Sequence, residues 1–241
     1  MRRRLLIALA LACALAGCQE SGFDESRETQ RPLKVQHAMD ELTGTKVPGV
    51  AKHPMTLTAD TLGDTLALGV TPVRAALPGG RLPDYLREDA GGVEVVAPLT
   101  DLDLAATEAA EPDVILGSKE EQEDLYEDLS RIAPTVMTEG DNWKLNLRLH
   151  GEALGRTNDA EELLTDWDDR VAEVRDRLRE AGTSRVAGDP PSAFAEQVLA
   201  DLGLRSGGGN GPAIRVEWGP EWSGGGLLAA RAALEDVAAA L

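Results

Sequence analysis

The longest regular pattern in the sequence is a helical one, and it constrains the fold more than any other segment. Between Asp159 and Ala181, apolar residues recur at steps of three and four, which places them on one face of an α-helix. This apolar face consists of Ala160, Leu163, Leu164, Trp167, Val171, Val174, Leu178 and Ala181. Asn158 and Glu161 predict a capping box at the start, and Gly182 is typical of a helix end. At a rise of about 1.5 Å per residue the helix would be ~35 Å long, enough to bridge two lobes.

Short strand patterns alternate with helical ones before this helix, which predicts an α/β fold with a mostly parallel sheet. The expected strands lie at 55–59, 72–76, 92–97, 114–117 and 135–138. The expected helices lie at 61–68, 102–110 and 119–132. After residue 182 the pattern weakens to helices at 192–202 and 226–241 and a strand at 214–218, beside a glycine-rich stretch at 205–211.

Residues 1–17 have the three parts of a secretory signal peptide. Three arginines precede an apolar run from Leu5 to Leu15, and small residues follow up to Cys18. The run is shorter than the about 20 residues that a membrane-spanning helix needs. The sequence LAGC at 15–18 resembles the lipobox of bacterial lipoproteins, in which the cysteine is lipidated and becomes the first residue of the mature chain. The alternative is an ordinary secreted protein with a cysteine at the cleavage site by chance.

We therefore expect lipidation of Cys18 and a location outside the cytoplasm, anchored to the bacterial cell membrane. Residues 18–32 are polar and lack periodicity, so they would form a flexible tether. Cys13 lies in the segment that would be removed, which leaves the mature chain without a disulfide.

The charge of the chain excludes several classes of partner and chemistry. Without residues 1–17 it has 21 basic and 42 acidic residues, a net charge near −21, which argues against nucleic acid and against lying flat on an anionic membrane. Such acidity is also typical of plain solubility. His37, His53 and His150 lack metal-ligand spacing, and no catalytic triad is legible. We expect no enzyme activity, no metal site and no cofactor.

Several segments between residues 56 and 203 occur in a distinctive order. They are TLTADTLGDTLALGVTPV at 56–73, PDYL at 83–86, GVEVV at 92–96, EPDVILGS at 111–118, GEALGR at 151–156 and FAEQVLADLG at 194–203. Together they resemble the substrate-binding lipoproteins of ABC importers for ferric siderophores, haem and vitamin B12. The resemblance implies a two-lobed periplasmic-binding-protein-like fold with a single long interlobe helix.

The resemblance also implies a division of the chain, with one departure. The first α/β lobe would span 33–157, the interlobe helix 158–182 and the second lobe 183–241. Members of the family are longer than this chain, and the shortfall lies after residue 182, so we expect a truncated second lobe. A lobe of this size buries little apolar area.

The function that the resemblance implies is binding without chemistry. A lipid-anchored monomer would capture a ferric siderophore or similar iron chelate and deliver it to an ABC permease. The alternative is a truncated, non-transporting relative that acts as a surface interaction protein or is a decaying copy.

A ligand would bind in the cleft between the lobes, where loops follow the carboxyl ends of parallel strands. The candidate ligand-binding residues are Asp60, Thr61, Arg74, Tyr85, Ser118, Lys119, Trp143, Arg215, Trp218 and Trp222. Other roles compete: the polar residues after strands are often helix caps, and the tryptophans could serve packing. Trp167, on the apolar face of the long helix, is expected in the core.

In the resembled family, one exposed carboxylate on each lobe docks onto arginines of the permease. The first-lobe glutamate of the family aligns near Ala105, so Glu108 or Asp103 would have to substitute for it. Glu196 is the candidate in the second lobe. Ordinary solvated acids are an equally good interpretation of these positions.

Overall fold

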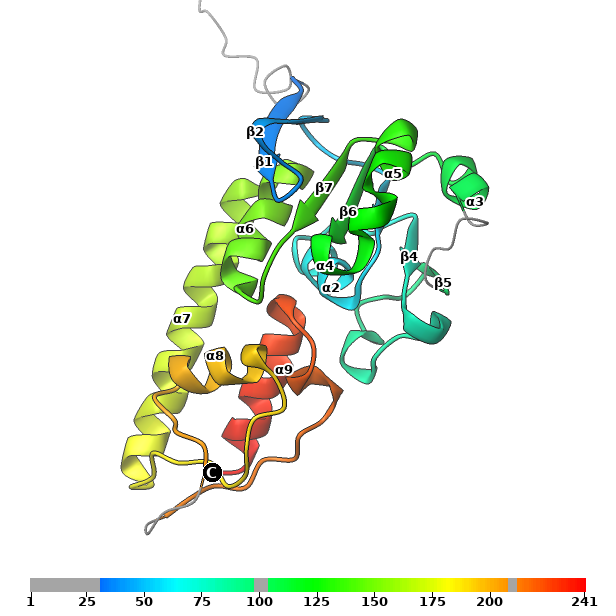
Figure 1. The fold of residues 1–241 in the computed structure, drawn as a ribbon. Coiled ribbons are helices and arrows are strands. Elements are labelled where there is room, and N and C mark those ends of the chain that lie inside the picture. Colours follow the sequence, from blue (N-terminus) through cyan, green and yellow to red (C-terminus); the bar gives the residue numbers. More distant parts are fainter. Residues whose placement is uncertain (1–30, 98–103, 208–211) are drawn as a thin grey trace, which may run out of the picture.

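The computed structural model describes residues 31–97, 104–207 and 212–241. The first lobe is built on a five-stranded parallel sheet with the strand order β5-β4-β3-β6-β7, as Figure 1 shows. Its strands are β3 (Pro54–Thr56), β4 (Arg74–Ala76), β5 (Glu94–Val96), β6 (Val114–Ser118) and β7 (Thr135–Thr138). The order of the strands reverses between β3 and β6, which opens a crevice at the carboxyl ends of these strands.

The predicted α/β class and parallel sheet are confirmed, and the sequence of β6 explains its central position. Val114, Ile115 and Leu116 have no exposed surface, as expected for a parallel strand covered on both faces. Helices on the first lobe are α2 (Ala59–Ala67), α3 (Leu104–Ala109), α4 (Lys119–Gln122), α5 (Tyr126–Ile132) and α6 (Trp143–Leu154). Short 3₁₀ turns are η1 (Pro78–Gly80), η2 (Asp84–Leu86) and η3 (Glu123–Leu125).

The long helix is α7 (Thr157–Glu180), and it runs along one side of the molecule from the first lobe to the second (Figure 1). Its apolar stripe is buried as predicted, and Trp167 is 1% exposed. The expected capping box is wrong: the helix begins after Arg156, and the structure gives this N-cap no side-chain hydrogen bond. Gly182 ends the helix as predicted, with φ +67°, and the Thr183 N–H donates to the Leu178 carbonyl in a Schellman arrangement.

The second lobe consists of α8 (Ala193–Asp201), η4 (Pro220–Trp222), α9 (Gly226–Ala239) and loops. The strand expected at 214–218 is wrong, because only single bridges join Val186 to Ile214 and Arg185 to Arg205 in the described part of this lobe. Helix α9 packs against α2 and α6 of the first lobe, so the apolar residues of both lobes form one continuous core.

Three further differences concern the first lobe. The sequence patterns gave no indication of the antiparallel hairpin β1 (Leu33–His37) and β2 (Asp40–Val47), or of α6 as a helix. The single helix expected at 119–132 is divided into α4, η3 and α5. The charge and apolar spacing of this segment are compatible with one helix, but the chain after β6 forms these shorter pieces instead.

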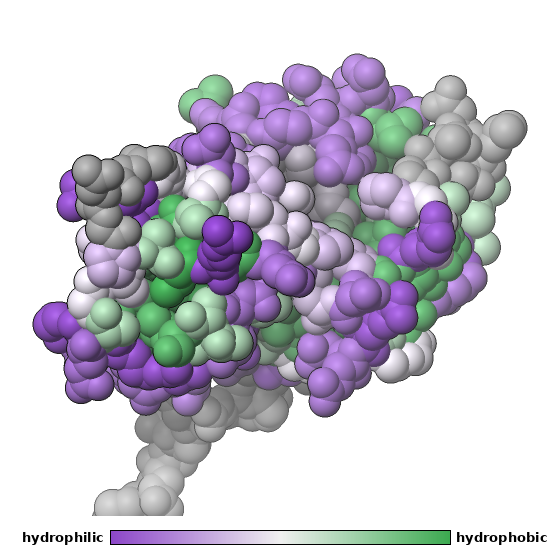
Figure 2. All heavy atoms as spheres, turned by 90° about the horizontal axis from the view of Figure 1, so that it is seen from below, coloured by the Kyte–Doolittle hydropathy of each residue, from purple (hydrophilic) through white to green (hydrophobic). Residues whose placement is uncertain are grey.

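The surface matches the acidic composition. Seen from the end opposite the sheet, it is largely hydrophilic with smaller apolar areas between (Figure 2). Leu42, Leu145 and Leu241 are the exposed large apolar side chains among the described residues. Within these residues, no helix combines the length and apolar character required to cross a bilayer.

Candidate functional site

A cavity of about 190 Å³ lies where the carboxyl ends of β3, β6 and β7 face the second lobe. The first lobe contributes most of its lining: Thr58, Asp60, Asp64, Ser118, Glu120, Glu121, Thr138, Gly140, Asp141, Trp143, Asn146 and His150. The second lobe contributes Phe194 from α8 and the segment Gly224–Gly226 at the start of α9. The cavity therefore lies at the crevice that the strand order predicts for an open α/β sheet.

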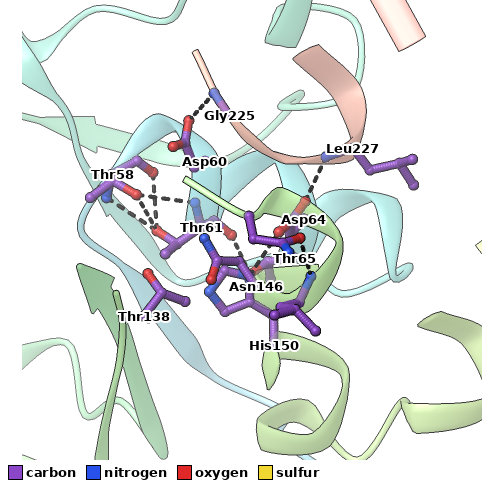
Figure 3. A network of polar contacts seen from close by, with 12 residues as sticks. Thr58, Asp60, Thr61, Asp64, Thr65, Thr138, Asn146, His150, Gly225 and Leu227 are labelled. Carbon is purple, nitrogen blue, oxygen red and sulfur yellow. Dashed lines mark hydrogen bonds and ion pairs between the residues drawn. The ribbon is translucent and has the colours of Figure 1, made fainter. Parts of the chain in front are cut away.

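The start of α2 forms one wall of the cavity. Thr58 caps the helix: its hydroxyl accepts from the Thr61 N–H at 3.1 Å, and the Thr61 hydroxyl accepts from the Thr58 N–H at 3.1 Å. This reciprocal box fixes the first turn and holds Asp60 at the cavity (Figure 3). Asp60 Oδ1 then accepts a hydrogen bond of 2.6 Å from the Gly225 N–H of the second lobe.

Asp64, one turn further along α2, joins three helices. Its Oδ1 accepts from the Leu227 N–H of α9 at 2.7 Å, and its Oδ2 lies 2.8 Å from His150 Nδ1 of α6 (Figure 3). Asp64 and His150 are 0% and 1% exposed, so the pair is fully buried. A carboxylate accepts hydrogen bonds, so Nδ1 carries the hydrogen toward Asp64. His150 Nε2 is also buried and has no hydrogen-bond partner.

Glycine is required where the second lobe meets α2. A Cβ at Gly225 would overlap the Asp60 carboxylate, and one at Gly226 would lie 2.7 Å from Asp64 Oδ1. Gly226 also has φ +78°, which other residues rarely adopt. The close approach of the backbone is what brings the Gly225 and Leu227 N–H groups to the two carboxylates.

The cavity is strongly acidic. Its lining contains Asp60, Asp64, Glu120, Glu121 and Asp141, and no lysine or arginine occurs among the described lining residues. Burial raises the pKa of Asp60 to about 6, the Gly225 N–H opposes the rise, and the negative charges of Asp64 and Glu121 add to it. Losing water disfavours a charged carboxylate, and neighbouring like charges disfavour it further.

Trp143 closes the cavity on the α6 side. It is 1% exposed and packs edge-on against Trp167 of α7, with ring centroids 5.1 Å apart. Its indole Nε1 is buried without a hydrogen-bond partner. The neighbouring Lys144 ammonium pairs with Asp201 at 2.8 Å and thus lies outside the lining.

The structure brings together only part of the predicted ligand-binding set. Asp60, Ser118 and Trp143 line the cavity, whereas Thr61 is buried in the capping box behind it. Tyr85 is half-buried near Gly224, which belongs to the lining, but is itself outside it.

The three predicted basic residues lie elsewhere. Arg74 bonds Glu94 and the Ala106 carbonyl, and Lys119 pairs with Glu139 at 2.7 Å. Arg215 is exposed on the second lobe and outside the lining. Their role in ligand binding stays a prediction.

Trp218 and Trp222 form an edge-on pair in the second lobe, with ring centroids 4.9 Å apart. Trp222 has no exposed surface, and its Nε1 donates to Asp236 at 2.9 Å, an arrangement that serves packing. Of the docking candidates, Glu108 on α3 and Glu196 on α8 are exposed. Asp103 and Cys18 lie outside the described residues.

Several residues that line the cavity were not among the predicted candidates, above all Asp64, Asn146 and His150. Trp143, Asn146 and His150 follow one another at steps of three and four, which is the pattern of one helix face. Recognising 143–154 as a helix would have placed them together. Asp60 and Asp64 likewise share a face of α2, but no local signal marks Asp64 as a buried acid.

Comparison with known proteins gives a consistent result. The sequence profile of a family described as "Periplasmic binding protein" matches residues 56–187. A probable siderophore-binding lipoprotein, YfiY of Bacillus subtilis, is 32% identical over 189 residues, which are 76% of this chain and 58% of that protein. An achromobactin-binding periplasmic protein of Dickeya dadantii is 30% identical over 58% of this chain and 51% of its own length. The chain thus spans little more than half the length of these two relatives.

Solved structures agree in fold. Staphylococcus aureus SirA complexed with staphyloferrin B has a TM-score of 0.60 and 29% identity, covering 72% of this chain and 64% of that one. The petrobactin-binding protein YclQ of Bacillus subtilis has a TM-score of 0.66, covering 87% of this chain and 98% of that one. At 18% identity, the second likeness shows the fold alone.

Proposed function

The chain belongs to the periplasmic binding protein family, and we propose that it captures a ferric siderophore or a similar iron chelate for an ABC importer. The observation that carries this proposal is the polar cavity at the carboxyl ends of β3, β6 and β7, closed by the second lobe. Relatives named for siderophore binding and achromobactin binding support the class of ligand. The proposed role involves no chemistry: the protein binds the chelate, encloses it and releases it.

The rest of the transport cycle is part of the same proposal. A lipid on Cys18 would hold the protein at the membrane through the tether 18–32, as a monomer beside the permease. Glu108 and Glu196, on opposite lobes, would dock onto it. The divisions at 33–157, 158–182 and 183–241 describe the first lobe, the bridging helix and the shortened second lobe.

Binding of a whole chelate requires the lobes to separate. The cavity of about 190 Å³ is smaller than the roughly 300–1,000 Å³ of usual ligand pockets. The segment Gly224–Gly226 covers it, held by the hydrogen bonds from Gly225 to Asp60 and from Leu227 to Asp64. We propose that this segment moves away from α2 on binding, while α7 stays intact as the rigid connection.

The alternative, a decaying or non-transporting relative, is not favoured. It predicts a poorly packed region after residue 182, whereas Val186, Val198 and Leu234 are buried and belong to the core shared with the first lobe.

Titration of the purified protein with a panel of hydroxamate, catecholate and carboxylate ferric siderophores tests the proposal. Trp143 lies at the cavity, so we expect quenching of tryptophan fluorescence, and a concentration-dependent rise in Tm. A ligand at about 100 times its Kd stabilises by ~2.7 kcal/mol. If no member of the panel changes either signal, the protein is not a ferric-siderophore carrier.

The anchor needs its own test. Cells that express the protein and grow with labelled palmitate should incorporate the label into it. Replacing Cys18→Ser should abolish both the label and retention at the membrane. Labelling that persists in the Cys18→Ser variant would exclude lipidation at this residue.

A further inference from the structure

Two buried nitrogen atoms of cavity-lining residues have no partner in the structure. They are Nε2 of His150 and Nε1 of Trp143, and both residues are 1% exposed. Buried polar groups are hydrogen-bonded in the great majority of cases, so an orphan at a cavity points to a partner that a ligand supplies. In the tautomer that directs its Nδ1–H at Asp64, His150 has a lone pair at Nε2, which accepts a hydrogen.

Carboxylates predominate among the side chains around these two nitrogen atoms. Asp60 lies on the α2 wall, Glu121 at the start of α4, and Asp64 behind His150. The basic residues closest in sequence to the lining are neutralised elsewhere, Lys119 by Glu139 and Lys144 by Asp201. An anionic ligand would meet the carboxylates of the first lobe with no lysine or arginine in the described lining beside them, whereas a cationic ligand would be attracted to them.

We infer that the chelate recognised by this site carries a positively charged amine, which enters the cavity between Asp60 and Glu121 and donates a hydrogen to His150 Nε2. The indole N–H of Trp143 would donate to a carbonyl oxygen of the same arm of the ligand. This inference rests on the proposed function and narrows its ligand to cationic chelates. The closed cavity has room for such an arm, and the iron-bearing body would occupy the space that opens when the segment Gly224–Gly226 moves away from α2.

Metal binding by the protein itself is a poorer explanation of the acidic walls. Among the described residues, no group of three or more histidine, cysteine, aspartate or glutamate side chains has the geometry to hold a metal ion. His150 is already engaged with Asp64 through its other nitrogen, and that carboxylate is itself bonded to the Leu227 N–H. A hydrogen-bond donor with a positive charge suits the cavity better than a bare cation.

The test uses one ferric chelate in three charge states. A linear trihydroxamate that ends in a primary amine is compared with its N-acetylated derivative and its N-succinylated derivative. The iron-binding groups stay the same, while the terminal group changes from positive to neutral to negative. We expect the amine form to bind at least about tenfold tighter than the succinylated form, with the acetylated form between them.

Substitutions of the lining acids test which residues produce the preference for the amine form. Asp60→Asn and Glu121→Gln should each reduce several-fold the ratio of the affinities for the amine form and the acetylated form, whatever their effect on binding overall. Glu162→Gln, on the exposed side of α7, is the matched control and should keep the full preference. Equal loss of binding for all three derivatives in a variant would indicate damage to the fold and not to charge recognition, so circular dichroism accompanies each titration.

The outcomes separate this inference from the proposed function. If the succinylated form binds as well as the amine form, or if only anionic catecholate or carboxylate chelates bind, the inference is overturned while the carrier function stands. If no ferric chelate of any charge binds, both fail. The inference is established if the original protein prefers the amine form and the Asp60 and Glu121 variants lose this preference.

Discussion

The two lobes contribute to the cavity in different ways. The first lobe supplies all the acidic side chains in the described lining of the cavity, from α2, from α4 and from the loop between β7 and α6. The second supplies backbone N–H groups at Gly225 and Leu227 and the apolar ring of Phe194. Recognition by charge therefore belongs to the first lobe, while the second acts as a cover that hydrogen-bonds to it.

The lobes also differ in what holds them together. Five parallel strands stabilise the first lobe by continuous backbone hydrogen bonding. In its described residues, the second lobe has single bridges at Arg185 and Val186 in place of a sheet, and its helix α9 packs on α7 and on the first lobe. A shortened lobe can thus be ordered when it shares its core with the neighbouring lobe. Its stability then depends on contacts with its neighbour, and breaking those contacts is the way to test this dependence.

Removing the buried carboxylate of Asp64 should have the largest effect. Asp64→Ala leaves His150 and the Leu227 N–H without their partner, at a cost of about 3–5 kcal/mol, which is typical of breaking a buried pair. Urea unfolding measures the loss. Limited proteolysis should then cleave the second lobe before the first, because α9 has lost the hydrogen bond of its Leu227 N–H to α2.

Asp64→Asn is the matched control, because it keeps an acceptor for one of the two donors and should lose less stability. If Asp64→Ala unfolds at the same urea concentration as the original protein, the second lobe does not depend on this connection. Cleavage of both lobes at equal rates would also contradict the comparison.

Changing Asp60 should have a smaller effect of opposite sign. Burial raises the pKa of Asp60 to about 6, above the ordinary value of about 3.9 in the unfolded chain. Between these values the folded state holds more protons than the unfolded one, so stability falls as pH rises from about 4 to 6. Asp60→Asn keeps an acceptor for Gly225 and removes the charge, so we expect a gain on the order of 1–2 kcal/mol at pH 7.5.

The pH dependence of the unfolding free energy checks whether Asp60→Asn raises or lowers stability. The difference in unfolding free energy between Asp60→Asn and the original protein should grow between pH 4 and pH 6.5 and then level off. A variant that is less stable than the original protein at pH 7.5 would show that the charged carboxylate strengthens the interlobe contact. Binding of the amine-bearing chelate by the original protein should weaken as pH falls through about 6, because protonation removes a negative charge that attracts the amine.

The smallest effect is expected at the surface connection between α7 and α9. The guanidinium of Arg170 contacts both carboxylate oxygens of Glu235 at 2.9 Å, and the pair is exposed. Exposed ion pairs contribute up to about 1 kcal/mol and are weakened by salt. Arg170→Ala should therefore lower Tm slightly at low ionic strength and hardly at all in 0.5–1 M salt, roughly the range in which such pairs are screened. A loss as large as that of Asp64→Ala would mean that surface charge, and not the buried contact, holds the second lobe.

Much of the first lobe was predictable because its signals are local. The apolar run at 114–117 predicts a buried strand, and the period of three to four residues predicts α7, since both follow from side-chain spacing. The hairpin at 33–47 was missed because its apolar residues are too few to show a clear period. Helix α6 was missed because its apolar residues at 143, 145, 147 and 149 alternate with polar ones, which is not the period of a helix. After residue 182, propensity alone predicted a strand at 214–218 where the structure has a single bridge at Ile214, because no neighbouring strand pairs with the rest of that segment.

The amino-acid sequence is enough to predict the fold class, the long helix and the location of a cleft at the ends of the strands, since these depend on periodicity and chain order. It also identified Asp60, Ser118 and Trp143 as residues near that cleft. Which acids face the cavity, and where the predicted basic residues lie, depends on how distant parts of the chain pack together. Asp64 contacts His150, 86 positions away, and Asp60 contacts Gly225, 165 positions away. No local pattern distinguishes an acid buried by such a distant contact from one left in water, because the difference arises only when α9 packs on α2.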